Sequence, residues 1–190
     1  LDPLANGPAN LWSKLDRVLE GLEPIKLLKN PVNVQHAIAQ KMPFADNFFD
    51  AIVTDPPYYD NIFYSVLADF FYAWKRILFT KVAPDLFTSA ATDTHSELVA
   101  SSFRSGNPKD AHLDYVRNLS FALNEAARTL KDDGVFSFVY SHSSLNGWLA
   151  IVQSFRNSAI RISSVQPLSI ERKARPRAIK SDAINTCVTF

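Results

Sequence analysis

The string Asp55-Pro56-Pro57-Tyr58 combines residue types that suit methyl transfer to an amino nitrogen on an aromatic ring. Such a nitrogen is a poor nucleophile because its lone pair is conjugated with the ring. The Asp55 carboxylate and the Pro56 carbonyl can accept its two hydrogens, which favours a more tetrahedral nitrogen with an available lone pair. Proline stiffens the backbone that holds this carbonyl, and the Tyr58 ring gives a base a flat face to stack on. Catalysis would consist mainly of positioning and of dipoles aimed at developing charge.

The position of this string along the chain favours a functional interpretation. Residues 49–54 form a compact apolar run, which predicts a strand covered on both faces of a sheet. Pro56 and Pro57 end that strand because neither has an N–H group for the ladder. The string therefore follows the carboxyl end of a strand, where open α/β sheets bind ligands. The structural alternative is an aspartate-capped turn stiffened by two prolines.

The remaining pattern predicts an α/β fold with a largely parallel sheet. Apolar residues recur at helical spacing in four segments, and Asp60 is a plausible cap for the second. The predicted helices span about residues 11–22, 62–78, 114–130 and 144–155. The other predicted strands span about residues 32–38, 135–140, 160–165 and 183–190. Residues 81–110 are polar and weakly periodic, and a connection of that length usually has a function.

Composition places the chain among ordinary globular proteins and excludes several classes. The chain has 190 residues, of which 47% are hydrophobic and 21% charged, with a formal charge of +1. A single cysteine, Cys187, excludes an internal disulfide and fits a reducing compartment, which predicts a cytoplasmic location. No apolar run reaches the ~18 residues of a membrane helix. The net charge gives no overall signal for nucleic-acid binding.

Several residues outside the string are candidates for contacts with substrate or DNA. Tyr59 lies next to the string, outside the predicted helix, and could stack on a base. His142 follows the predicted strand 135–140 and is either a substrate contact or a structural histidine at a strand-to-helix turn. Arg172, Lys173 and Arg175 belong to a basic stretch that could bind phosphates or form a solvated loop. The other histidines are scattered, and their spacing predicts no metal site.

The segment from Met42 to Asn61 resembles the amino-methyltransferases of DNA. More narrowly, it is similar to the large prokaryotic adenine-specific DNA methylases associated with a zinc-ribbon module. These pair Asp-Pro-Pro-Tyr-Tyr-Asp-Asn with a helix like residues 65–76 of this chain. The resemblance extends over about residues 32–190.

The resemblance implies a Rossmann-like fold, S-adenosylmethionine as methyl donor, and N6 of adenine in DNA as acceptor. A base inside a duplex must be flipped out before it can enter such a site. The implied catalytic loop is Asp55, Pro56, Pro57 and Tyr58, with Asp55 also facing the cofactor. The position that approaches the cofactor's adenosine corresponds to Ile38. Residues 31–190 would form this catalytic portion, and residues 1–30 a separate helical segment.

The chain lacks one part that the family has. The glycine-rich loop after the first strand is absent, and the five glycines are scattered. Because the chain also begins at Leu1 and has its only methionine at Met42, we expect it to be part of a longer protein. We therefore expect a partial fold whose missing N-terminal part is one partner and DNA the other. Methylation of cytosine N4 or of an RNA base stays open, as does a non-catalytic nucleic-acid-binding or scaffold role.

Overall fold

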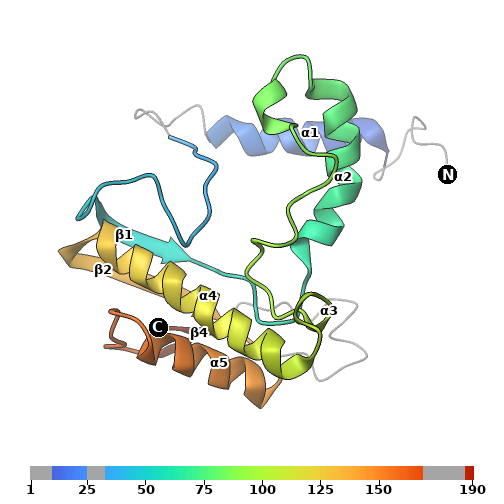
Figure 1. Cartoon of the computed structure of the whole chain (residues 1–190). Coiled ribbons are helices and arrows are strands. Elements are labelled where there is room, and N and C mark those ends of the chain that lie inside the picture. Colours follow the sequence, from blue (N-terminus) through green and yellow to red (C-terminus); the bar gives the residue numbers. More distant parts are fainter. Residues whose placement is uncertain (1–9, 25–32, 169–186) are drawn as a thin grey trace. The chain divides into compact units, whose positions relative to one another are not determined.

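The computed structural model describes residues 10–24, 33–168 and 187–190 (Figure 1). The chain divides into two compact units, Leu1–His36 and Ala37–Phe190. The basic residues Arg172, Lys173 and Arg175, expected to bind phosphates, lie outside the described residues.

The described part of the first unit holds the helix that the apolar spacing predicts, α1 (Leu11–Leu22). The side chain of Asn10 caps it by accepting a hydrogen bond of 2.7 Å from the Ser13 N–H. Its stripe of leucines, with Trp12 and Val18, is exposed within the unit.

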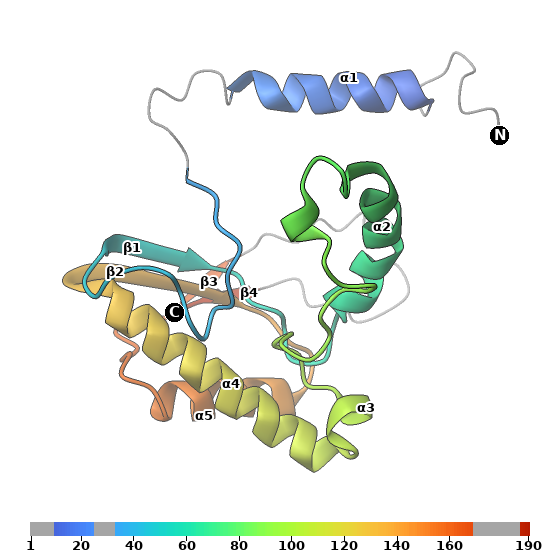
Figure 2. The ribbon, with the colours of Figure 1, turned by 45° about the horizontal axis from the view of Figure 1, so that its top comes forward.

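The second unit is a mixed α/β structure built on a four-stranded sheet (Figure 2). Its strands are β1 (Phe49–Thr54), β2 (Leu130–Tyr140), β3 (Gln166–Leu168) and β4 (Cys187–Thr189). Their spatial order is β1-β2-β4-β3, with β1 parallel to β2 and β4 antiparallel to both of its neighbours. Strands β1, β2 and β3 therefore run in one direction, and β4 runs against them.

Two helices that run in the same direction, α4 (Pro108–Thr129) and α5 (Leu145–Arg156), lie together along one face of the sheet (Figure 2). Each begins where a side chain satisfies a free amide: Asn107 accepts from Asp110 N–H, and Ser144 from Gly147 N–H. The core between helices and sheet is largely aromatic and aliphatic. Its most buried members are Tyr115, Leu119, Leu123, Phe138, Tyr140, Ala150 and Ile151.

The expectation that strand 49–54 is covered on both faces is wrong. Ile52 and Thr54 turn toward the helices, whereas Val53 on the opposite face is 77% exposed. Val135, on the neighbouring strand, is 64% exposed. In the described part of the second unit β1 is an edge strand, so no strand there pairs with its outer edge. The face that carries Val53 and Val135 is open within this unit.

Helix α2 (Tyr64–Phe79) forms as predicted, but its apolar stripe is not part of the core. Phe70, Phe71 and Trp74 are all exposed among the described residues. Asp60 does not cap this helix either. The Ser65 N–H instead donates to Glu97 Oε1 at 3.0 Å, because the connection after the helix returns along it.

The long connection at residues 81–110 is a strap along α2 rather than a free loop. It contains a 3₁₀ turn at Pro84–Leu86 and a short helix, α3 (Ser102–Ser105). The Thr92 N–H donates to Asp69 Oδ1 of α2 at 2.7 Å. The Arg104 guanidinium donates to the carbonyls of Thr94, Glu97 and Val99, which fixes the end of the strap.

Four predicted boundaries are wrong. Strand β2 begins at Leu130 rather than at about residue 135. The described part of 32–38 holds no strand, only an isolated bridge from Ile38 to Lys41. Residues 160–165 belong to no strand, and β3 begins at Gln166. Helix α4 starts six residues early because Asn107 and Pro108 form a cap and a first-turn proline. None of the helices within the described ranges is long and apolar enough to cross a membrane.

A polar contact fixes the segment before β1 to α4. The Met42 N–H donates to Glu125 Oε1 at 2.8 Å, and Arg128 bonds both Glu125 and Asp46. Hydrogen bonds from Arg128, aided by the Met42 N–H, lower the pKa of Glu125 from 4.5 to about 2. The carboxylate therefore stabilises the folded state only where it is ionised.

We predict that Glu125→Gln reduces the acid sensitivity of the fold. A depressed folded pKa adds stability above the unfolded value, and this contribution is lost as pH falls from 4.5 toward about 2. The natural protein should therefore lose more stability than the variant between about pH 6 and about pH 3. Urea unfolding at both pH values measures this difference, and equal losses would contradict the role assigned to Glu125.

Candidate active site

The Asp55-Pro56-Pro57-Tyr58 loop begins where β1 ends at Thr54. Strand β2 is parallel to β1, so the turn after Tyr140 emerges at the same edge of the sheet. That turn carries His142. Asp55 is exposed, while Pro56, Pro57 and Tyr58 are half-buried. The Asp55 carboxylate therefore faces solvent, while the three residues that follow it are partly enclosed by the protein.

Tyr115 of α4 holds the second half of this loop. Its hydroxyl donates to the Pro57 carbonyl at 2.9 Å and accepts from the Tyr59 N–H at 3.4 Å. The Tyr115 side chain is only 1% exposed, and burial raises its pKa well above the usual value. The phenol therefore keeps its proton and remains a donor.

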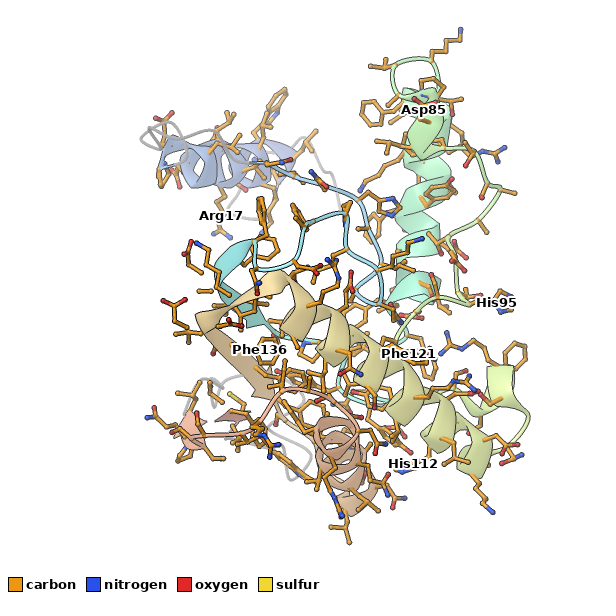
Figure 3. The ribbon with its side chains drawn as sticks, turned by 60° about the vertical axis from the view of Figure 1, so that its left-hand side comes forward. Arg17, Asp85, His95, His112, Phe121 and Phe136 are labelled. Atoms are coloured by element: carbon orange, nitrogen blue, oxygen red, sulfur yellow. The ribbon has the colours of Figure 1, made fainter. Side chains whose placement is uncertain are left out.

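Tyr59 is a structural residue here. It has φ of 52°, in the left-handed region that costs energy for a residue with a Cβ. Its side chain is buried, and its hydroxyl lies 3.0 Å from His112 Nδ1. His112, labelled in Figure 3, also lies 2.8 Å from Gln153 Oε1 of α5. Burial of the ring argues against Tyr59 as a stacking platform for a base.

His142 is buried and bonded at both ring nitrogens, which favours the structural interpretation over direct substrate contact. The Ser144 N–H donates to Nδ1 at 3.0 Å, so Nδ1 must be the unprotonated nitrogen. Nε2 then carries the hydrogen and donates to Asp60 Oδ1 at 3.0 Å. Asp60, expected to cap a helix, instead ties the loop to the β2–α5 turn.

Two residues of α5 fix the place of His142. The indole N–H of Trp148 donates to the His142 carbonyl at 2.9 Å. Gly147 packs against the imidazole so closely that a Cβ would collide with its Cγ and Nδ1. Only glycine fits at that position while the ring stays where it is.

The Tyr58 ring contacts the edge of Tyr140, with ring centroids 5.1 Å apart. Burial, together with a hydrogen bond to the Asp55 carboxylate, raises the pKa of Tyr58. The phenol is therefore neutral and can help to orient Asp55.

An apolar cavity of about 300 Å³ lies beneath the loop. Asp55, Pro56 and Pro57 form one wall, and the side chains of α4 and β2 form the others. Asp55 is the one ionisable residue of its lining. Ala39 and Met42 also line the cavity. Ile38, expected to contact the cofactor, does not line it and is exposed. A flat ring with an amino group has the shape and polarity that such a cavity accepts.

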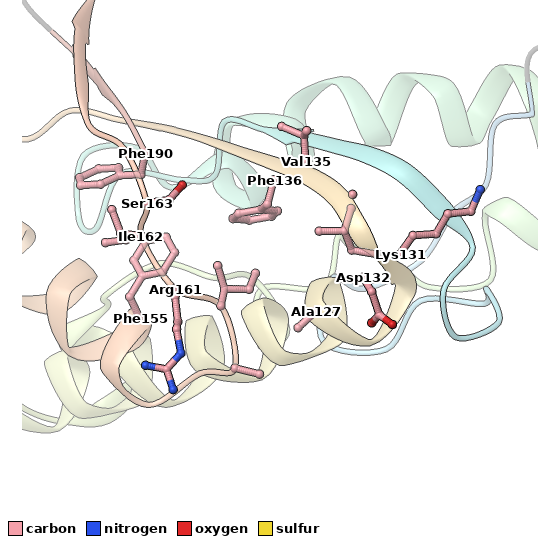
Figure 4. A pocket seen from close by; sticks show the side chains of 14 residues that line it. Ala127, Lys131, Asp132, Val135, Phe136, Phe155, Arg161, Ile162, Ser163 and Phe190 are labelled. Carbon is pink, nitrogen blue, oxygen red and sulfur yellow. The ribbon is translucent and has the colours of Figure 1, made fainter.

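A second cavity, of about 430 Å³, shares none of the loop residues (Figure 4). It lies over β2 and the segment after α5, and its lining includes Ala127, Lys131, Val135, Arg161 and Ile162. The Asp55 carboxylate is not part of its lining. It therefore offers a comparison site within the same fold.

The string and His142 lie at the same edge of the sheet, as the parallel pairing implies. The side chains that hold the loop and the strap in place were not predicted from the sequence. Tyr115 could have been noticed, because a tyrosine on the apolar face of a helix needs a partner for its hydroxyl. His112 and Glu97 gave no such signal. Across residues 10–24, 33–168 and 187–190, no group of three or more His, Cys, Asp or Glu residues could hold a metal ion.

Comparisons with protein-family models, with curated proteins and with solved structures found no match to this chain. What supports a function is therefore the geometry of the loop and its surroundings.

We predict that Gly147→Ala displaces His142 and destabilises the second unit by about 1–3 kcal/mol, the usual cost of overpacking. Thermal unfolding measures the change. Gly21→Ala is the matched control, since a Cβ there meets nothing within 4 Å and alanine favours a helix. A Gly147→Ala protein as stable as the natural one would show that the imidazole is free to move.

Proposed function

We propose that this chain is the catalytic portion of an S-adenosylmethionine-dependent methyltransferase that modifies N6 of adenine in DNA. The observation that carries the proposal is the Asp55-Pro56-Pro57-Tyr58 loop, held at the carboxyl end of a parallel strand above an apolar cavity. Ligands bind at this edge in open α/β sheets. The resemblance of residues 42–61 to DNA amino-methyltransferases supports the choice of reaction.

The chemistry assigned to this chain concerns the methyl acceptor. The cavity walls would bury the faces of the base, while the Asp55 carboxylate and the Pro56 carbonyl accept the two amino hydrogens. This arrangement draws the nitrogen lone pair out of conjugation and toward the donor. Asp55 is exposed to solvent and can pass the released proton to water. Cys187 is buried in β4, away from any Pro-Cys string, which argues against covalent attack on cytosine C5.

The donor side of the reaction is not complete in this chain. S-adenosylmethionine supplies an electrophilic methyl group, but the glycine-rich turn that would approach its amino-acid end is absent. We therefore assign no step to the cofactor here. Contacts of Asp55 and Ile38 with the cofactor stay predictions.

The free edge of β1 supports the proposal of a missing N-terminal part as partner. In a doubly wound sheet of order 3-2-1-4-5-6, the fourth strand pairs with the first strand, whose following turn binds the cofactor. Strand β1 fits the fourth position, because its described neighbour lies on one side only. A Rossmann-like sheet would then be completed outward from β1, and the exposed Val53 would be covered.

Two other functions remain as alternatives. The same string serves acceptors such as cytosine N4 or an RNA base, and mass analysis of methylated nucleosides distinguishes these products. A non-catalytic nucleic-acid-binding or scaffold domain would keep the fold without binding the cofactor. Calorimetry of the full-length protein with S-adenosylmethionine separates that role from the enzyme.

We predict that Asp55→Ala in the full-length protein lowers the rate of DNA methylation by at least about a hundredfold, because it removes an acceptor aimed at the reacting nitrogen. Asp55 is exposed, so the unfolding temperature should change little. Transfer of a radiolabelled methyl group to DNA measures the rate. Asp85→Ala, at an exposed aspartate in the strap (Figure 3), is the control expected to stay active. Full activity of Asp55→Ala would refute the proposal.

We also predict that filling the cavity blocks the reaction. Ala122 lines the cavity beneath the loop, so Ala122→Leu should raise KM for DNA or abolish methylation. Ala127 lies further along the same helix and lines the other cavity (Figure 4). Ala127→Leu should therefore leave KM within about twofold, in line with the small effect of changes away from a site. Equal effects of the two substitutions would show that the cavity beneath the loop is not the binding site.

A further inference from the structure

Two successive prolines make the catalytic loop difficult to hold by its own backbone. Pro56 and Pro57 have no N–H group, so they offer only carbonyl oxygens as hydrogen-bonding groups. Side chains from other elements supply the missing partners. Tyr115 bonds the Pro57 carbonyl and the Tyr59 N–H, and His142 bonds Asp60.

We propose that Tyr115 and His142 are positioning residues, which fix the loop at both ends of its tight turn so that the Pro56 carbonyl is the one presented to the substrate. This inference rests on the function proposed above, and it deepens it. Neither side chain needs to touch the base, and both are buried.

The distribution of hydrogen bonds explains the choice between the two carbonyls. The Pro57 carbonyl accepts from Tyr115 and also from the Tyr59 N–H, at 2.9 and 3.1 Å. The Pro56 carbonyl accepts no hydrogen bond from the described residues. It is thus the carbonyl left open beside Asp55, in the wall of the cavity.

The turn between the two anchors is conformationally costly and needs to be held. Tyr59 adopts the left-handed conformation between the bond at Pro57 and the bond at Asp60. Such a residue persists only where its surroundings over-determine it. The Ala100 N–H also donates to the Tyr59 carbonyl at 2.9 Å, so the strap closes the turn from a third side. Loss of an anchor should let the loop relax and turn the Pro56 carbonyl away.

The decisive variant is Tyr115→Phe in the full-length protein, which removes one oxygen and keeps the ring. We expect kcat for DNA methylation to fall about tenfold or more, since small misplacements are costly, while KM for DNA and S-adenosylmethionine stays within about twofold. Amide hydrogen exchange of residues 58–61 should become severalfold faster. Ser120→Ala is the matched control, because it removes another buried hydroxyl of α4 that does not contact the loop.

A second pair of variants tests His142. His142→Gln keeps an N–H donor near the Nε2 position and should retain most of the turnover, whereas His142→Leu should lose turnover and loop protection together. Unchanged exchange in Tyr115→Phe and His142→Leu would overturn the proposal, as would faster exchange with unchanged kcat. If the natural full-length protein transfers no methyl group, the proposed function fails. The exchange measurements then still decide whether the two side chains fix the loop.

Discussion

Because β1 and β2 run parallel, their carboxyl ends meet at one edge of the sheet, and the arrangement of the site depends on that pairing. The loop after β1 and the turn after β2 come within hydrogen-bonding distance there, which allows His142 to reach Asp60. Helix α4 begins near this edge and leads into the start of β2, so its first half places Tyr115 beneath the loop. A reversed β2 would have placed Tyr140 and His142 at the far end of the sheet.

Burial makes these few polar contacts effective. The core beside the loop is built from aromatic rings, with Tyr115, Phe138 and Tyr140 all close to fully buried. In surroundings of low polarity an unpaired hydroxyl is costly, so a tyrosine there is fixed to its partners. Packing of the rings makes the site rigid, and the hydroxyl of Tyr115 fixes the loop by a hydrogen bond. The same residues thus serve the core and the loop.

Local signals in the sequence predicted the parts of the fold that depend on neighbours along the chain. The apolar run before Asp55 marks β1, and Ser144 marks the start of α5 through its capping side chain. Contacts between distant segments could not be predicted in this way. Asp60 has the sequence position of a helix cap, but in the fold its carboxylate accepts a hydrogen bond from His142 of the β2–α5 turn. The side chain of Ser65 donates to Glu97, which is 32 residues further along the chain.

The errors about burial share one physical cause. An apolar run predicts that its side chains are removed from water, but it does not say which segment covers them. One face of the run in β1 and the apolar stripe of α2 remain exposed in the described part of the chain, as Val53 and Phe70 show. Helices α4 and α5 pack against one face of the sheet, beside the Asp55-Pro56-Pro57-Tyr58 loop. Under the proposed function, the exposed face and the free edge of β1 are where a cofactor-binding part of the protein would join, so the uncovered apolar surface and the missing donor groups would have the same cause.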